Sequence, residues 1–100
     1  MPSQQVVYIF WRDIPAQFIV GKGRQAEKVK LPDRFEKAID KCAMKLKFTD
    51  TDSYLKEWRK TSPIAREGSL EDVISRENER FEIDYNNKKL NSLIENGGIS

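Results

Sequence analysis

Six consecutive β-branched and aromatic residues at positions 6–11 constrain the fold more than any other feature of the sequence. The run is too short to form a stable helix and is rich in strand formers, so we predict a β-strand over about residues 5–12. Both faces of this strand are apolar. A half-exposed strand would alternate apolar and polar residues, so we predict that other elements cover this strand on both sides.

A second apolar run, residues 18–20, follows a turn that contains Asp13 and Pro15. Asp bonds readily to nearby backbone, and Pro lacks the N–H that a strand ladder needs, so the two residues interrupt the strand. The run ends at Gly21-Lys22-Gly23, and residues 27–31 are suited to a short third strand. We predict an antiparallel hairpin that this third strand extends.

The clearest helical pattern begins after Pro32, which costs no hydrogen bond at a first helical turn. Asp33 and Glu36 favour the positive end of the helix dipole. Apolar residues then recur at the spacing of an amphipathic helix: Phe35, Ala38, Ile39, Cys42, Ala43 and Leu46. The only thiol in the chain lies in this stripe, so we predict a buried cysteine that behaves as a small hydrophobic residue.

Two more helices are predicted further along the chain. Thr49 or Asp50 can cap a short helix that runs to about residue 60 and turns three residues toward the core, Tyr54, Leu55 and Trp58. Ser69 and Asp72 have the spacing of a capping box at the start of the next helix. The apolar stripe of that helix is Leu70, Val73, Ile74, Phe81 and Tyr85.

The apolar pattern changes phase after Tyr85. At about 100° per residue, Ile83, Leu90 and Ile94 fall nearly opposite the preceding stripe. Either the chain breaks near Asn86-Asn87 and a final helix folds back, or one long helix offers this second face to another subunit. Asn is a poor helix former and a good cap, which favours the break. The three residues also predict a homodimer face.

These elements define an α+β fold, with a β-hairpin or three-stranded antiparallel sheet packed by three to four helices. The 100 residues have room for one domain, residues 1–100. No stretch approaches the roughly 18 apolar residues of a membrane span, and the start lacks the pattern of a secretory signal, so we expect a cytoplasmic protein without membrane contact. The sequence has no His and one Cys, which excludes His-based nucleophile pairs and most zinc sites. We expect no catalytic residues, no metal and no cofactor.

Charge is distributed unevenly along the chain. Residues 22–60 carry twelve basic and seven acidic residues, a net +5, whereas residues 61–100 carry five and eight, a net −3. A basic ridge of four residues follows one face of the first predicted helix: Arg34, Lys37, Lys41 and Lys45. Like charges four residues apart repel by about 0.2 to 0.5 kcal/mol per pair, so acidic residues from 67–84, solvent or a binding partner must offset them. A total charge of +2 without interleaved aromatic residues argues against nucleic acid as that partner.

The segment 11–17 is the most site-like part of the sequence because it crowds an aromatic ring, two opposite charges and an amide around a turn. Four candidate binding residues could converge on a small anion or a partner backbone: Trp11, Arg12, Asp13 and Gln17. The alternative is a plain hairpin in which Arg12 and Asp13 bond nearby main chain. Lys22 and Arg24 add two cations in a glycine-rich turn that lacks the spacing of a phosphate-binding loop. Trp58 is placed either to stack a planar ligand or to fill the core.

The chain resembles the small "virulence factor" domain family. The likeness covers about residues 6–60 and rests on four groups of residues: Trp11-Arg12-Asp13-Ile14-Pro15-Ala16-Gln17; Gly23-Arg24; Arg34-Phe35 with Ala38-Ile39-Asp40 and Ala43-Met44; and Tyr54 with Glu57-Trp58-Arg59. Members of this family stand alone or are attached to helical repeats and to a domain similar to part of an iron-sulfur scaffold. The resemblance implies neighbours among folate and corrinoid methyl-transfer proteins and an accessory role, and it assigns no ligand to any residue.

We therefore expect a non-catalytic accessory or adaptor module that binds another protein through the turn at residues 11–17 and neighbouring basic residues. The alternative is a small ligand-binding protein or enzyme of one-carbon metabolism, in which Arg12 and Asp13 orient an anionic ligand. A weaker alternative is nucleic-acid binding through the basic ridge, and affinity that falls steeply with salt would identify it.

Overall fold

The computed structural model describes residues 3–48 and 50–99 and begins with the predicted hairpin. Strand β1 (Ser3–Trp11) pairs antiparallel with β2 (Ile14–Val20) around a turn at Arg12 and Asp13. The register shifts between Ile9 and Phe10, so β2 carries one extra residue there. After a short 3-10 turn, η1 (Gly23–Gln25), strand β3 (Glu27–Lys30) pairs with β2 and forms one edge of the sheet. Both the hairpin and the third strand are confirmed.

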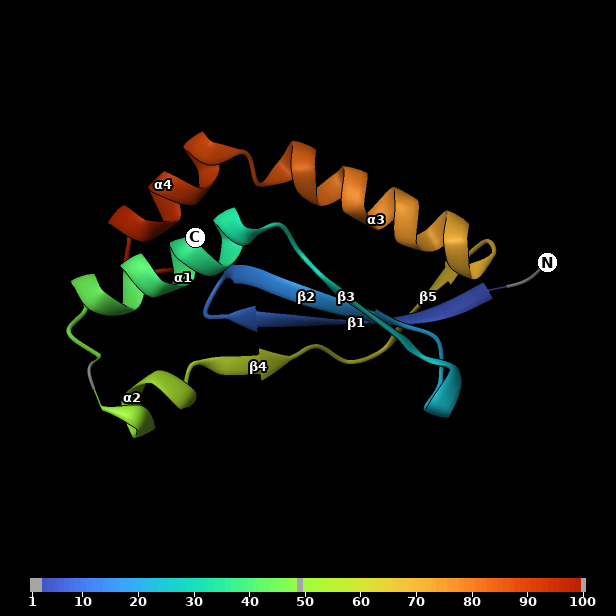
Figure 1. The fold of residues 1–100 in the computed structure, drawn as a ribbon, viewed down its shortest axis with the longest axis horizontal. Coiled ribbons are helices and arrows are strands. Elements are labelled where there is room, and N and C mark those ends of the chain that lie inside the picture. Colours follow the sequence, from blue (N-terminus) through green and yellow to red (C-terminus); the bar gives the residue numbers. More distant parts are fainter. Residues whose placement is uncertain (1–2, 49, 100) are drawn as a thin grey trace.

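Two further strands lie along the other side of β1 (Figure 1). Strands β4 (Trp58–Lys60) and β5 (Ile64–Glu67) both pair antiparallel with β1. Between them, the backbone N–H of Thr61 donates to the Tyr8 carbonyl at 3.0 Å, and the Tyr8 N–H donates to the Thr61 hydroxyl at 3.0 Å. The sheet therefore has five strands among the described residues, more than the two or three predicted.

Helix α2 (Thr51–Leu55) is shorter than predicted. Asp50 caps it by accepting a hydrogen bond from the Ser53 N–H at 3.0 Å, whereas Thr49 lies outside the described residues. The prediction that this helix continues to about residue 60 is wrong, because Trp58 leaves the helix and pairs with Trp11 in the sheet. Tyr54 and Trp58 have the spacing of neighbours on one helix, but Tyr54 belongs to α2 and Trp58 to β4.

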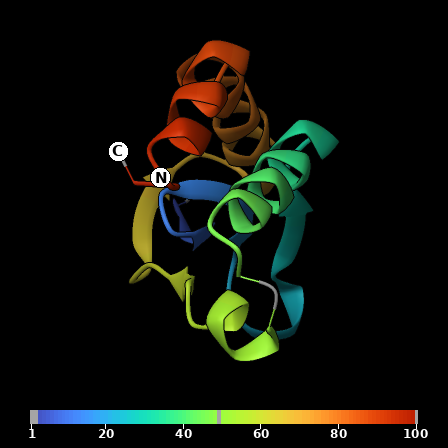
Figure 2. The same cartoon turned by 90° about the vertical axis from the view of Figure 1, so that its left-hand side faces the viewer.

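The three longer helices lie along one face of the sheet, and α2 lies at the end of the molecule where β1 turns into β2 (Figures 1 and 2). They are α1 (Asp33–Lys45), α3 (Leu70–Asp84) and α4 (Asn87–Glu95). The predicted stripe of α1 faces inward, with every member buried except the half-buried Leu46. Together with the sheet these helices confirm the α+β fold.

Aromatic rings fill the layer between α3 and the sheet. Phe81 of α3 stacks on Phe18 with ring centroids 5.9 Å apart and meets Tyr8 edge-on at 5.7 Å. Such pairs add about 0.5 to 1.5 kcal/mol beyond the area that they bury. On the opposite face of β1, Trp11 is fully buried, but Val7 and Ile9 are only half-buried. The prediction that other elements cover both faces of β1 therefore holds for this second face only at Trp11.

The chain breaks between α3 and α4, as the pattern predicts. Asn86 caps α4 by accepting a hydrogen bond from the Lys89 N–H at 2.9 Å, and α4 folds back against α1. Leu90 is only 3% exposed and Ile94 packs against the core, whereas Ile83 remains 68% exposed. The break rotates α4 and turns Leu90 and Ile94 inward, so the three residues do not share one exposed face in the folded chain. The homodimer stays a prediction.

Candidate functional site

Trp11 lies inside the molecule at the end of the hairpin. Its indole N–H donates to the Tyr54 carbonyl at 3.0 Å, and its ring packs against Tyr54 at 5.9 Å and Phe48 at 6.2 Å. The ring is fully buried. It anchors the segment around α2 to β1.

Arg12 ties the hairpin turn to two distant segments. Its guanidinium donates to the Gly97 carbonyl at 2.8 Å and to the Glu57 carboxylate at 3.2 Å, and it lies 5.1 Å from the centre of the Phe48 ring. The Arg12 backbone N–H also donates to the Glu57 carbonyl at 3.0 Å. These bonds hold the residue at a φ of 54°, a left-handed conformation that a non-glycine residue adopts at a cost.

Asp13 completes the turn. Its backbone N–H donates to the Gly98 carbonyl at 2.8 Å, and its carboxylate pairs with Arg59 at 3.1 Å. Arg59 in turn donates to the Arg12 carbonyl at 2.9 Å. The first three residues of the motif thus hold the hairpin against residues 97–98, Tyr54 and β4. Arg12 and Asp13 do bond their own chain, but to segments that are far away in the sequence and not only to main chain. A role for them in binding a partner stays a prediction.

Lys22 and Arg24 do not join this cluster. Both are exposed at the η1 end of the hairpin, and the full length of β2 separates them from the turn at Arg12 (Figure 1). The glycines beside them, Gly21 at φ 105° and Gly23 at φ 59°, allow the chain to reverse there. Lys22 and Arg24 therefore lie in an exposed surface turn.

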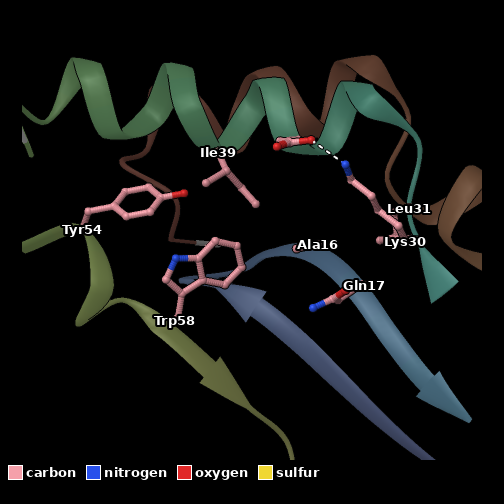
Figure 3. Close-up of a pocket in the computed structure, with 8 residues that line it drawn as sticks. Ala16, Gln17, Lys30, Leu31, Ile39, Tyr54 and Trp58 are labelled. Carbon is pink, nitrogen blue, oxygen red and sulfur yellow. Dashed lines mark ion pairs between the residues drawn. The ribbon is translucent and has the colours of Figure 1, made fainter. Parts of the chain in front are cut away.

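Gln17, the last candidate of the motif, lines a separate cavity of about 170 Å³, which we call the aromatic pocket (Figure 3). The pocket lies between α1, α2 and the sheet, and its residues are Ala16, Gln17, Lys30, Leu31, Glu36, Ile39, Tyr54 and Trp58. Lys30 and Glu36 form an ion pair at 3.0 Å on one side of it. Burial raises the pKa of the Tyr54 hydroxyl, and the nearby Asp40 carboxylate acts in the same direction.

Sequence reasoning singled out Gln17 and Trp58 separately but did not bring them together. Gln17 belongs to β2 and Trp58 to β4, two strands on opposite sides of β1. Their shared pocket depends on the pairing of β4 with β1, which the sequence pattern did not predict. The one available signal was an aromatic residue followed by two cations at positions 58–60.

The basic ridge faces α4. At one end Arg34 donates to the Tyr85 carbonyl and pairs with Glu82 at 3.5 Å, and at the other end Lys45 donates to the Glu95 carbonyl at 3.3 Å. The two middle lysines are exposed and form no ion pair within the described part of the chain: Lys37 and Lys41. Glu82, one of the acidic residues in 67–84, therefore offsets one end of the ridge, which is one of the possibilities that the sequence left open, and α4 offsets the other end.

Glu77 is a buried carboxylate whose partners the sequence did not reveal. It pairs with Arg80 at 2.7 Å and with Arg66 of β5 at 3.4 Å. The Glu77 carboxylate is only 7% exposed, so this pair joins β5 to α3. Asp84, also on α3, is exposed, and its carboxylate lies 3.7 Å from the Arg80 guanidinium.

Cys42 is buried, as predicted. Burial raises the pKa of its thiol, and the charges of Arg12 and Lys45 oppose that effect. Within residues 3–48 and 50–99, no group of three or more His, Cys, Asp or Glu is arranged to hold a metal ion. No helix in the same ranges has the length and apolar character needed to cross a bilayer.

The fold and these contacts define a small α+β domain with a clamped hairpin turn, an aromatic pocket and a basic helix face. The virulence factor family model matches residues 9–94, and the chain belongs to this family. The match extends beyond the segment 6–60 on which the resemblance was based. Comparisons with curated proteins and with solved structures give no match.

Proposed function

We propose that this protein is a non-catalytic accessory module that binds another protein at the end of the molecule formed by the hairpin turn. The observation that carries the proposal is exposed apolar surface next to the turn. Leu55 is 55% exposed and follows Tyr54, whose carbonyl bonds Trp11. Ile99 is 49% exposed and follows Gly98, whose carbonyl bonds Asp13.

Met44 extends the apolar surface at this end. It is 77% exposed in the last turn of α1, which lies at the same end of the molecule as α2 and the hairpin turn (Figures 1 and 2). Exposed apolar side chains at one end of the molecule favour a protein partner, and Glu57 and Arg59 add charges beside the turn. The bonds of Arg12 hold the surface rigid before binding, which lowers the entropy lost on association.

The available side chains support binding in preference to catalysis. The sequence offers no imidazole, and the single thiol is buried with a raised pKa. We propose the cytoplasm as the compartment and one-carbon or corrinoid methyl-transfer systems as the source of the partner, on the basis of what the family resemblance implies.

Site-specific photocrosslinking in the native cell tests this proposal. A photoreactive residue is placed at Met44 or Leu55, and a matched control is placed at Glu79, which is exposed on α3. We expect the same protein to be crosslinked from both test positions and not from the control. The purified partner should then bind the wild type at least ten times more tightly than Leu55→Asp. Equal crosslinking from all three positions, or none from cells in which the protein is abundant, contradicts the proposal.

The two alternatives are tested on different surfaces. Arg12 and Asp13 are bonded to their own chain, so the small-ligand alternative is better supported at the aromatic pocket. For nucleic acid, Lys37 and Lys41 are the two cations of the ridge whose charges are not offset by neighbouring helices. Titration with duplex and single-stranded oligonucleotides at low salt tests that alternative, and absence of binding removes it.

A further inference from the structure

The aromatic pocket has walls of two chemical kinds (Figure 3). Apolar and aromatic side chains form most of its lining: Ala16, Leu31, Ile39, Tyr54 and Trp58. The polar groups are gathered toward one side, where Gln17 and Lys30 sit opposite each other on paired strands and Lys30 reaches Glu36 of α1. Ligand pockets characteristically combine such an apolar wall with a few convergent polar groups.

The side-chain amide of Gln17 is the polar group that most clearly points to a ligand. Gln17 is half-buried, and Figure 3 shows its amide turned into the pocket toward the Trp58 indole. Within the described residues, this amide donates and accepts no hydrogen bond. An amide provides one donor and one acceptor side by side, so its natural complement is another amide-like edge.

Trp58 provides a flat surface beside that amide. The residue is half-buried at the start of β4, and its indole rises into the space below Ile39, with Tyr54 on one side and Gln17 on the other (Figure 3). Stacking of a planar ring on an aromatic side chain contributes about 1 to 3 kcal/mol by alanine substitution in nucleic-acid complexes. A volume of about 170 Å³ admits one ring and its substituents rather than a large cofactor.

We propose that the aromatic pocket binds a small planar heterocycle that carries an amide-like edge. The ring stacks on Trp58, and its adjacent donor and acceptor bond the Gln17 amide. The Lys30–Glu36 pair is exposed, with side chains 66% and 59% accessible, so it opens at little cost to contact a polar substituent. An apolar side chain of a protein partner would fill the same space but leave the Gln17 amide unpaired. This site is separate from the protein-binding surface proposed above.

Nuclear magnetic resonance on the purified, ¹⁵N-labelled protein tests the proposal without any partner. The chain has two tryptophans, so the fully buried Trp11 indole signal reports the fold and the Trp58 indole signal reports the pocket. The probes are uracil and nicotinamide, with benzyl alcohol as a ring that lacks the amide edge. We expect both probes to shift the Trp58 indole and Gln17 amide signals at millimolar concentration or below, and to leave Trp11 in place.

Three variants separate stacking from the amide contact. Gln17→Leu should weaken uracil and nicotinamide about 30-fold, to the level of benzyl alcohol, because the two hydrogen bonds of the amide contribute about 1 kcal/mol each. Trp58→Leu should abolish the shift of the Gln17 signal with all rings. Gln5→Leu, a half-buried glutamine on β1 outside the pocket, should change nothing.

Two results overturn the proposal. In the first, neither probe shifts the Trp58 or Gln17 signal although the Trp11 signal shows a folded protein. In the second, N-acetyl-phenylalanine amide binds more tightly than both probes and Gln17→Leu has no effect on any of them. The second result would make the pocket an anchor point for a protein side chain.

Discussion

Replacement of Arg12 tests whether the hairpin turn is held by its side chain against its own backbone preference. The guanidinium makes two hydrogen bonds, to Gly97 and Glu57, while its side chain is 18% exposed. At the same time the residue has a φ of 54°, where L-residues are strained. Arg12→Ala and Arg12→Gly remove the same hydrogen bonds. They differ in backbone strain, because glycine adopts a positive φ without steric cost and alanine does not.

The magnitudes follow from these contacts. A hydrogen bond to a charged group contributes about 1.5 to 3 kcal/mol, the contact with Phe48 about 0.5 to 1 kcal/mol, and partial exposure reduces the sum. We expect Arg12→Ala to lower the free energy of unfolding by about 2 to 4 kcal/mol. Glycine at position 12 removes about 1 to 2 kcal/mol of left-handed backbone strain from the folded state. It also increases the entropy of the unfolded chain, which lowers stability by about 0.4 to 1 kcal/mol. Arg12→Gly should therefore be more stable than Arg12→Ala by about 0.5 to 1 kcal/mol.

Urea unfolding followed by tryptophan fluorescence measures both differences, because Trp11 lies beside the substituted residue. Arg24→Ala, at an exposed position of η1, is the control and should stay within about 0.5 kcal/mol of the wild type. The reasoning is refuted if Arg12→Gly is no more stable than Arg12→Ala, or if Arg12→Ala is as stable as the control.

Three further predictions concern the core and its titrating groups. Leu90→Ala should lower the free energy of unfolding, measured in urea, by about 2 to 5 kcal/mol, because Leu90 is buried. Ile83→Ala should change it by less than about 0.5 kcal/mol, because Ile83 is exposed. Equal effects of the two substitutions would contradict the placement of α4. Burial raises the pKa of Tyr8 above the ordinary 10.0, so this tyrosine loses its proton more easily in the unfolded chain than in the folded one. The free energy of unfolding should therefore fall as the pH rises above 10, and Tyr8→Phe should make this fall less steep. An identical pH profile for the variant and the wild type would contradict the burial of the Tyr8 hydroxyl. The Cys42 thiol should react with a disulfide reagent only at the rate of unfolding, and rapid labelling of the folded protein in the absence of urea would show that the site is open.

The parts of the fold that were predicted correctly depend on short-range patterns. The run at residues 6–11 and the turn at Asp13 define the hairpin. The i, i+3, i+4 stripe defines α1, and Asn86 ends one helix and caps the next, because each signal lies within a few residues of the element that it forms.

The strands after α2 left no comparable signal. Residues 64–67 of β5 show no alternation of apolar and polar residues, and every one of them is exposed. They form a strand because their backbone pairs with β1. Trp58 had the spacing of a helical core residue but became a strand residue for the same reason. Edge pairing of this kind depends on long-range contacts and is not encoded in the local sequence pattern.

The candidate sites divide in the same way. The sequence predicted that Trp11, Arg12 and Asp13 belong to one turn, because they are neighbours in the chain. Their partners, Tyr54, Gly97, Gly98 and Arg59, became known from the folded chain, as did the pocket that Gln17 shares with Trp58. The tertiary structure also decided that Leu90 faces inward. The physical reason is that local periodicity defines the faces of an element, whereas the partner of each face is selected by packing between segments that are far apart in the chain.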